Sequence, residues 1–375
     1  MDSSLPAPSA RPQPKTSILD VSVIIPARNE EANLGACLQS LTTQVGIEFE
    51  IIVVDDASND RTREIAESFS GVRVISARPL SEDLTGKQST GKNNALEVGV
   101  ESARANWFLF TDADTVHLPG SLMRALKEAE NEKAHLLSYS PEQIVVTFTE
   151  RAVMPVIFSE LARQYPPRKV RDPESQIVAA NGQYILVRRA AYEAVGGHAA
   201  VRSEILEDVA LARLFRNGGF HVHFRYGGDV VRARMYRNWV QLRAGWTKNL
   251  ALLFPQSTRM AMQSLLFWFL AWTSLALAGS AAWNRHPLGI GFLCFWVVVY
   301  RRIRISHFRF VNNLLAIAFG FPIFTYLLLR SNAAHKQGRI RWKGRAYNVG
   351  TGEWREAARA SKIPIVKGQE LRADN

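Results

Sequence analysis

Two pairs of acidic residues are the first candidates for chemistry in this sequence. Asp55 and Asp56 directly follow the apolar run EIIVV, and Asp112 and Asp114 follow the apolar run WFLF and a threonine. Neighbouring carboxylates repel each other unless a cation compensates them. A hard divalent cation such as Mg²⁺ or Mn²⁺ accepts carboxylate oxygens and keeps positions that the oxygens of a diphosphate can fill. The pairs therefore indicate a site for a metal-bound nucleotide diphosphate, although a single Asp also suits a helix cap or a turn.

Apolar strands that alternate with helices must position these acids. The pattern predicts strands at residues 21–25, 50–54, 72–77 and 107–114, and helices at about 34–41, 60–69 and 93–103. This alternation is typical of an α/β fold with a mostly parallel central sheet that is covered on both faces. Ligands of such sheets bind beyond the carboxyl ends of the strands. Both acidic pairs lie at such ends, so we expect them to meet in one site.

The composition limits the class of protein. The chain has 375 residues, of which 47% are apolar, so it can bury a large core. Its 46 basic and 34 acidic residues give a formal net charge of +12, which favours an anionic partner such as an acidic membrane surface or a phosphorylated substrate. Nucleic acid is a poor candidate because no recognition module is present. Cys37 and Cys294 are far apart, so they suggest neither a disulfide framework nor a metal site.

The C-terminal third contains three long apolar segments. They cover residues 261–282, 287–300 and 311–329. The first and third are long enough to cross a membrane, whereas the second is short for a crossing. The basic stretch HKQGRIRWKGR that follows favours an even number of crossings, because basic residues tend to stay on the cytoplasmic side. We therefore expect a multi-pass protein of the cell (inner) membrane with its folded domain in the cytoplasm.

The order and spacing of six motifs resemble a known family. The motifs are VSVIIPARNEEANL, EIIVVDDASNDRT, GKNNAL, FLFTDADT, NGQYILVRRAAYEAVGGH and ILEDVALA, and the resemblance runs from about Val21 to Asn249. Together they resemble the inverting family 2 glycosyltransferases of the GT-A type, and within them the membrane-anchored enzymes that glycosylate carotenoids, hopanoids or ceramide. The resemblance implies a GT-A fold. It also implies metal-dependent transfer of a sugar, with UDP-hexose as the expected donor, to a lipid acceptor at the cytoplasmic membrane face.

The resemblance assigns residues to the nucleotide end of the donor site. Pro26, Ala27, Arg28 and Glu30 match the loop that borders the base and the ribose. Asp56 matches the position that hydrogen-bonds the uracil. A carboxylate suits this role because it accepts hydrogen bonds from N–H donors.

Further matches concern the diphosphate and the metal. Lys92, next to Gly91, matches an element near the diphosphate, for which LTGK at residues 84–87 is a competing copy. Asp114 matches the metal ligand, and Asp112 matches a contact to the ribose or to a metal-bound water. The implied cofactor is a divalent metal, Mg²⁺ or Mn²⁺. His198 in the AVGGH turn either touches a diphosphate oxygen or has a structural role.

Glu207 and Asp208 form the acidic pair of the last motif. Within the resemblance, Asp208 is the catalytic base, which removes the proton from the acceptor hydroxyl as that oxygen attacks the anomeric carbon. Inversion at that carbon follows if no covalent intermediate forms. The alternative is that both acids merely stabilise the first turns of a helix, where negative charge is favoured by the helix dipole.

The segment RMYRNWVQLRAGWTKN occupies the place where the family often closes over the nucleotide. Gln241, Arg243 and Trp246 are residues of the expected types, but the spacing QLRAGW departs from the usual Q-x-x-R-W. A basic amphipathic helix that lies on the membrane is the competing interpretation.

The sequence thus predicts four regions: a flexible tail at 1–19, a GT-A catalytic domain at 20–255, a membrane region with two or three hydrophobic helices at 256–330, and a basic tail at 331–375. The expected partners are the sugar nucleotide, a lipid acceptor and membrane phospholipid. One alternative is a processive polysaccharide synthase, which would normally have the intact Q-x-x-R-W motif and more spans. Another is a catalytically silent membrane scaffold that binds nucleotides.

Overall fold

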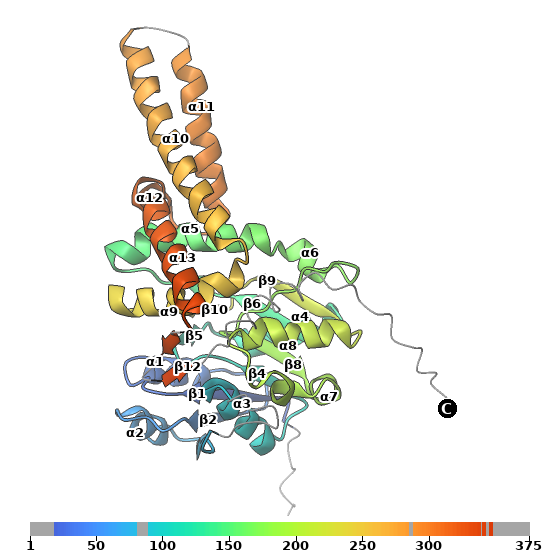
Figure 1. Ribbon diagram of the computed structural model, residues 1–375. Helices are drawn as coiled ribbons and strands as arrows, with labels where there is room; N and C mark the ends of the chain where they lie inside the picture. Colours follow the sequence, from blue (N-terminus) through green and yellow to red (C-terminus); the bar gives the residue numbers. More distant parts are fainter. Residues whose placement is uncertain (1–18, 81–88, 285–287, 339, 343–344, 348–375) are drawn as a thin grey trace, which may run out of the picture.

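A seven-stranded sheet forms the centre of the N-terminal part of the molecule (Figure 1). The computed structural model describes residues 19–80, 89–284, 288–338, 340–342 and 345–347. The strands, in their order across the sheet, are β3 (Val72–Ser76), β2 (Phe49–Asp55), β1 (Val21–Ala27), β4 (Trp107–Phe110), β8 (Ile185–Arg188), β6 (Leu136–Ser140) and β9 (Val222–Tyr226). Two tails, at 1–18 and 348–375, and the competing LTGK element at 84–87 lie outside the described residues.

The sheet is mostly parallel, as the sequence predicts. β3, β2, β1 and β4 are parallel neighbours, and β6 is parallel to β9. β8 is antiparallel to both β4 and β6. The four predicted strands are those that form the parallel half, and their carboxyl ends all point to one edge. The expected α/β fold with a mostly parallel central sheet is confirmed.

Helices cover both faces of the sheet because its strands are apolar on both sides. Val23 and Ile25 of β1 belong to one apolar cluster, whereas Ile24 between them belongs to the other. The first cluster includes residues of α1 (Leu34–Thr42), α2 (Thr62–Glu67) and α4 (Ser121–Asn131). The second includes residues of α3 (Gly91–Ser102), α7 (Arg189–Ala194) and α8 (Glu207–Asn217).

A small second sheet fixes the chain just beyond β4. Its strands, in order, are β5 (Thr115–His117), β10 (Val231–Ala233) and β7 (Glu142–Gln143). The hydroxyl of Thr115 donates to the carbonyl of Asp112 (2.8 Å), and the N–H of Arg234 donates to the carbonyl of Asp114 (3.1 Å). The backbone that carries both acids is thereby held between the two sheets.

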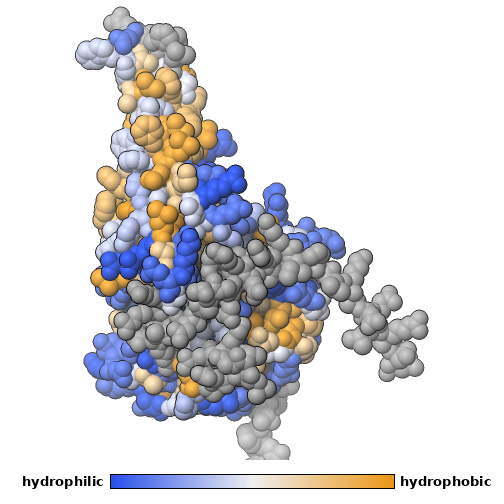
Figure 2. Space-filling view, in the orientation of Figure 1, coloured by the Kyte–Doolittle hydropathy of each residue, from blue (hydrophilic) through white to orange (hydrophobic). Residues whose placement is uncertain are grey.

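The C-terminal part is helical. Its elements are α9 (Trp239–Leu253), α10 (Ser257–Trp283), α11 (Leu288–Arg304), α12 (Phe310–Leu315), the π-helical η2 (Ala316–Gly320), α13 (Phe321–Lys336), and a hairpin of β11 (Ile340–Trp342) and β12 (Arg345–Tyr347). Three helical elements, α5 (Phe148–Gln164), α6 (Pro167–Arg171) and η1 (Gly197–Val201), come earlier in the chain, between strands of the α/β part. α10 and α11 form an antiparallel pair that projects from the body, while α5, α9 and α13 lie between this pair and the central sheet (Figure 1). Figure 2 shows apolar surface gathered over the projecting pair.

The predicted apolar segments correspond to these helices. Two stretches of the described residues, Ser257–Trp283 and Phe310–Lys336, are long and apolar enough to cross a membrane. Only 17% of the most apolar window in the first is buried, against 50% in the second, which packs against the body. The second stretch runs through the π turn at Ala316–Gly320, just before Pro322. A proline has no N–H for the helix, and a π turn is a common way for a helix to accommodate such an irregularity.

Two contacts attach these helices to the α/β body. Gly320 packs so closely on α5 that a Cβ at this position would meet the carbonyl oxygen of Ala152 at 2.2 Å. Glu160 of α5 is buried and accepts from the guanidinium of Arg302 on α11 at 2.6 Å. That guanidinium also lies over the ring of Phe267 on α10, 4.9 Å from its centroid. α11 and the π-helical η2 are thus both attached to α5.

We expect Gly320→Val to destabilise the protein by about 1–3 kcal/mol, because the new Cβ must displace the backbone of α5. The measurement is the thermal unfolding of the purified protein in detergent. Gly279→Val is the matched control, since it places the same residue in α10 where no atom lies within 4 Å of the new Cβ. Equal midpoints for the two variants would contradict the close packing of Gly320 on α5.

Candidate active site

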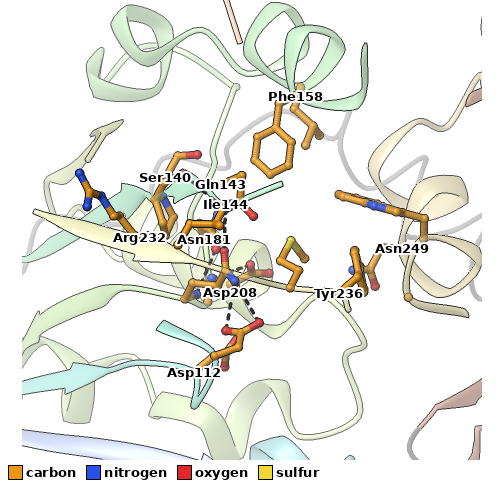
Figure 3. Close-up of a pocket in the computed structure, with 18 of the residues that line it drawn as sticks. Asp112, Ser140, Gln143, Ile144, Phe158, Asn181, Asp208, Arg232, Tyr236 and Asn249 are labelled. Carbon is orange, nitrogen blue, oxygen red and sulfur yellow. Dashed lines mark hydrogen bonds between the residues drawn. The ribbon is translucent and has the colours of Figure 1, made fainter. Parts of the chain in front are cut away.

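A large cavity of about 1700 Å³ opens beyond the carboxyl ends of β1 and β4. Its lining includes these residues expected from the sequence: Pro26, Ala27, Arg28, Glu30, Asp56, Gly91, Lys92, Asp112, Asp114, Glu207, Asp208, Gln241 and Trp246. His198 and Arg243 do not line it. In Figure 3, Asp112 lies at the sheet end of the cavity and Asp208 lies above it. The fold therefore brings the three acidic segments together, as expected for ligand sites of parallel sheets.

The loops after β1 and β2 are tied to each other at the edge of this cavity. Arg28 donates from Nη1 to the backbone carbonyl of Asp56 (2.5 Å). The N–H of Glu30 donates to the hydroxyl of Thr62 (2.7 Å). Asp56 itself is buried. The two loops therefore form a preorganised wall, which lowers the entropic cost of binding a ligand there.

Lys92 bridges two carboxylates at the floor of the cavity. Its Nζ lies 2.8 Å from Oδ1 of Asp112 and 2.7 Å from Oε1 of Glu207. The three side chains come from the first turn of α3, the link after β4 and the first residue of α8. Burial alone would lower the pKa of Lys92, but the two carboxylates raise it well above its usual value. The ammonium group therefore stays charged and joins three elements of the fold.

The close packing around Lys92 needs a glycine at position 182. A Cβ there would lie 2.9 Å from Nζ of Lys92 and 3.3 Å from Oε1 of Glu207. The N–H of Gly182 donates to Oδ2 of Asp208 (2.9 Å). Gly182 thus leaves space for the ion pairs and also orients the neighbouring carboxylate.

Glu207 and Asp208 are adjacent acids with different protonation behaviour. Burial would raise the pKa of Glu207, but Lys92 and Lys248 lower it below its usual value. The pKa of Asp208 is raised to about 6, first by burial and then by the charge of Glu207. Its Oδ1 accepts from the N–H of Val209 (2.9 Å). A carboxyl group with a pKa near 6 is well suited to accept a proton at neutral pH.

Asp112 and Asp114 offer the oxygen ligands that a hard cation prefers. The side-chain amide of Gln183 donates to both oxygens of Asp114 (3.3 and 3.4 Å). Within the described ranges, no group of three or more acidic, His or Cys side chains is placed to hold a metal ion. A cation would therefore rest on one or two carboxylates and take its other ligands from a diphosphate and water. This is the usual binding mode of Mg²⁺, so the two residues fit such an ion.

Residues 22–196 match the family model described as glycosyl transferase family 2. They form a family 2 glycosyltransferase domain. The match starts in β1 and ends at the AVGG turn, so it includes the two acidic strand ends and Lys92, while α8 and α9 follow it. The protein is thus a glycosyltransferase, and the expected family and enzyme class are confirmed.

Curated relatives cover nearly the whole chain. The 4,4'-diaponeurosporenoate glycosyltransferase of Staphylococcus aureus strain MRSA252 is 28% identical over 351 residues, which is 88% of each chain. The enzyme of the same description from strain N315 is 28% identical over 366 residues, which is 90% of this chain and 92% of the relative. These alignments extend through the C-terminal helices.

Solved structures of similar fold include two with bound sugar nucleotides. Mannosyltransferase PcManGT from Pyrobaculum calidifontis, in complex with GDP-Man and Mn²⁺, is 17% identical with a TM-score of 0.45, and the match covers 85% of this chain and 87% of that one. S. aureus TarS 1–349 in complex with UDP-GlcNAc is 17% identical with a TM-score of 0.42, and the match covers 86% and 93% of the two chains.

His198 lies behind the floor of the large cavity. It is buried, its Nδ1 lies 2.9 Å from the hydroxyl of Tyr192, and its ring packs edge-on against Phe110 at 4.7 Å between centroids. Burial lowers its pKa to about 4, so the imidazole is neutral at physiological pH. Together with Lys92, Asp112 and Glu207 it lines a small cleft beside the main cavity.

The α9 segment, whose Q-x-x-R-W match is imperfect, forms one wall of the large cavity. Gln241 lines the wall, and its side-chain oxygen accepts from the N–H of Arg237 (2.9 Å). Trp246 is buried, and its Nε1 lies 3.3 Å from Sδ of Met154. Lys248 also lines the wall, and burial lowers its pKa. Arg243 is directed elsewhere, so Lys248 is the α9 cation that faces the acids.

Gly182 and Gln183 of the site have no assigned role in the prediction from sequence, and Lys248 belongs to the predicted closing segment without a role of its own. Gly182 and Gln183 belong to the quoted NGQYILV motif, whose polar start before a strand is a signal that a turn lies there. Lys248 follows the tryptophan of the QLRAGW segment. Because Lys248 lies two residues after Trp246, the two side chains point to different sides of α9. Only the packing of that helix in the fold shows that Lys248 lies near Asp208.

Proposed function

We propose that this glycosyltransferase moves a sugar from a UDP-hexose to a lipid acceptor at the cytoplasmic face of the membrane, with inversion at the anomeric carbon. The observation that carries this proposal is the composition of one cavity. It holds Asp112, Asp114 and the candidate base Asp208 at one end, and it is bounded by apolar side chains at the other. The relatives described as 4,4'-diaponeurosporenoate glycosyltransferases support a carotenoid-like lipid as acceptor.

Asp208 is the base of the proposed reaction. Its carboxylate takes the proton from the O–H of the acceptor while that oxygen forms a bond to the anomeric carbon and the bond to the diphosphate oxygen breaks. The sugar leaves with the acceptor, the electron pair leaves with the diphosphate, and the proton remains on Asp208. The ammonium groups of Lys92 and Lys248 lie near the acids and favour the negative charge that develops on the diphosphate.

Asp112 and Asp114 are the residues that would hold the divalent cation. When bound, such an ion neutralises charge on the leaving diphosphate. Arg28, Glu30 and Asp56 form the wall beyond them and suit the nucleotide base and ribose. On the opposite α9 wall, Gln241 would face the donor, and the buried Trp246 would support this wall through its contacts with Phe158 and Met154.

The projecting helices support a position of this cavity at the membrane. Large apolar side chains of α10 are exposed, among them Leu266 and Phe269, which no other described element covers. Exposed Arg301 and Arg304 lie at the end of α11 that returns to the body. Apolar surface suits the lipid interior, and arginines suit the cytoplasmic headgroups. An α10–α11 hairpin that crosses the bilayer twice fits both features and leaves the catalytic domain in the cytoplasm.

We expect Asp208→Asn to lower sugar transfer at least about 100-fold, because it removes the proton acceptor but keeps the shape of the side chain. The measurement is formation of glycolipid from a UDP-sugar and lipid extract, with binding of UDP followed by calorimetry. Binding of UDP should change less than about twofold, since the base does not hold the nucleotide.

The matched control for this variant is Asp229→Asn, which changes an exposed Asp outside the cavity. In the wild type, kcat/KM should rise as the pH increases towards the Asp208 pKa of about 6 and become level above it, because only the ionised carboxylate accepts a proton. Normal transfer by Asp208→Asn would show that another group is the base, and a wild type that binds UDP without transfer would instead support a silent nucleotide-binding scaffold.

Chelation with EDTA should abolish transfer, and Mg²⁺ or Mn²⁺ should restore it. In Asp114→Asn, the metal concentration that gives half-maximal transfer should rise at least about tenfold, since one carboxylate ligand is lost. Titration of each variant with metal measures this shift, and Asp229→Asn should titrate like the wild type. Full activity in EDTA would rule out the metal site.

A cysteine at the end of α10 tests the membrane topology. Trp283 is 90% exposed at the far end of the hairpin, so Trp283→Cys should react with an impermeant maleimide added outside intact cells. Val45→Cys, at an exposed position of the α/β domain, should react only after the membrane is opened. Labelling of Val45→Cys in intact cells, or protection of Trp283→Cys, would show that the proposed orientation is wrong.

A further inference from the structure

The cavity is larger than a sugar nucleotide site needs, and its second end is built differently from the first. Sites for a single small ligand usually measure about 300–1,000 Å³, whereas this cavity measures about 1700 Å³. The end away from the acids is lined by side chains of α5, α9 and the link between α11 and α12. These side chains, which we call the apolar arm, are Phe158, Leu161, Ala162, Tyr165, Leu253 and Phe308. Figure 3 shows Phe158 at the opposite end of the cavity from Asp112.

Aromatic contacts hold the walls of the apolar arm together. The ring of Phe158 lies edge-on to Trp246 of α9 (6.2 Å between centroids) and to Phe308 of the α11–α12 link (6.0 Å). The hydroxyl of Tyr165 donates to the backbone carbonyl of Leu253 (3.0 Å), so it joins α5 to the end of α9. The N–H of Trp246 is directed to Met154, a buried residue of α5. The polar atoms of these aromatic residues are therefore committed to the walls, and the arm has little to offer a polar ligand.

Exposed apolar residues continue from the cavity to the membrane-facing helices. Five residues line the cavity and are also exposed at its rim: Ile144, Val146, Val240, Ile305 and Val311. Val240 is 63% exposed and Val146 is 55% exposed. Next to this rim, the exposed ring of Phe148 packs on that of Phe319 at 5.4 Å, and Phe319 belongs to the second candidate membrane segment. An exposed apolar rim that joins a lipid-facing surface is typical of a path for an apolar molecule.

We propose that the apolar arm binds the hydrocarbon chain of the acceptor, which enters from the bilayer across the rim. This inference rests on the proposed lipid acceptor and adds the site that recognises it. The chain would lie along α5 with its reactive oxygen towards Asp208 and the sugar donor at the sheet end. The ligand class is a long unbranched or polyene chain with a single small polar end, since the arm offers length and apolar contact but few polar partners.

A fatty acid that carries a diazirine on its chain tests this site directly. The full-length protein in lipid nanodiscs is irradiated with the probe, and the crosslinked peptides are identified by mass spectrometry. We expect crosslinks on α5 near Leu161 and on the link near Phe308, in addition to those on lipid-exposed α10. The crosslinks on α10 provide an internal standard for the amount of probe in the bilayer.

Ala162→Trp should fill the arm and lower crosslinking of α5 about tenfold relative to α10, because the indole takes space that the chain occupies and a loss of burial for about two methylene groups corresponds to about a tenfold loss of binding. Ala282→Trp is the matched control, since it makes the same change at an exposed position of α10 outside the cavity. Unchanged UDP binding and an unchanged thermal midpoint would show that Ala162→Trp is folded.

The inference is overturned if the probe crosslinks only to α10 and α11. It is also overturned if the ratio of α5 crosslinks to α10 crosslinks is the same in Ala162→Trp and Ala282→Trp. In either case the transferase proposal stands as long as the wild type binds UDP and makes glycolipid. A wild type that neither binds UDP nor transfers sugar would instead defeat the proposed function, whatever the crosslinking pattern.

Discussion

The site depends on one half-buried cation between two carboxylates. Lys92 reaches Asp112 at 2.8 Å and Glu207 at 2.7 Å, and so connects α3, the end of β4 and the start of α8. Removing one partner of a buried pair leaves an uncompensated charge, which is strongly unfavourable. The same cation explains why two adjacent acids differ. Glu207 is held ionised by Lys92, and its negative charge, together with burial, raises the pKa of Asp208. Burial is the larger cause, the ionised Glu207 adds to it, and Lys92 opposes it, so the balance of all three sets the pKa of the proposed base.

The cavity separates charge from apolar surface along its length. The acids and the two lysines gather where the parallel strands end, because that edge is where the chain leaves the core and where N–H and C=O groups remain accessible. The apolar arm is built by α5, α9 and the link between α11 and α12. Two substrates of opposite polarity can therefore approach Asp208 from opposite ends, and an acceptor chain that fills the arm would exclude water from the reacting atoms.

Much of the fold follows from local patterns, whereas the site contacts do not. The apolar runs ending in Asp56 and Asp112 predict parallel strands and a shared edge, and both are confirmed. The antiparallel β8 gives no signal of its direction, since a four-residue apolar run pairs either way. The pairing of Lys92 with Glu207 joins residues far apart in the chain, so only tertiary packing reveals it. For the same reason, residue type alone cannot tell that His198 lies behind the cavity floor or that Lys248, not Arg243, faces the acids.

In the proposed membrane orientation, the position of the cavity relative to the bilayer depends on α5. This helix begins with a capping box between Thr147 and Glu150, so its first turn is fixed next to the cavity rim. At its other end, Glu160 accepts from Arg302, which places the base of the α10–α11 hairpin. α5 also supplies Phe158 and Ala162 to the apolar arm. One helix therefore links the base of the α10–α11 hairpin, the cavity rim and the apolar arm. A lipid acceptor would then meet the base at a depth set by packing, because a tilt of the hairpin must move α5 as well.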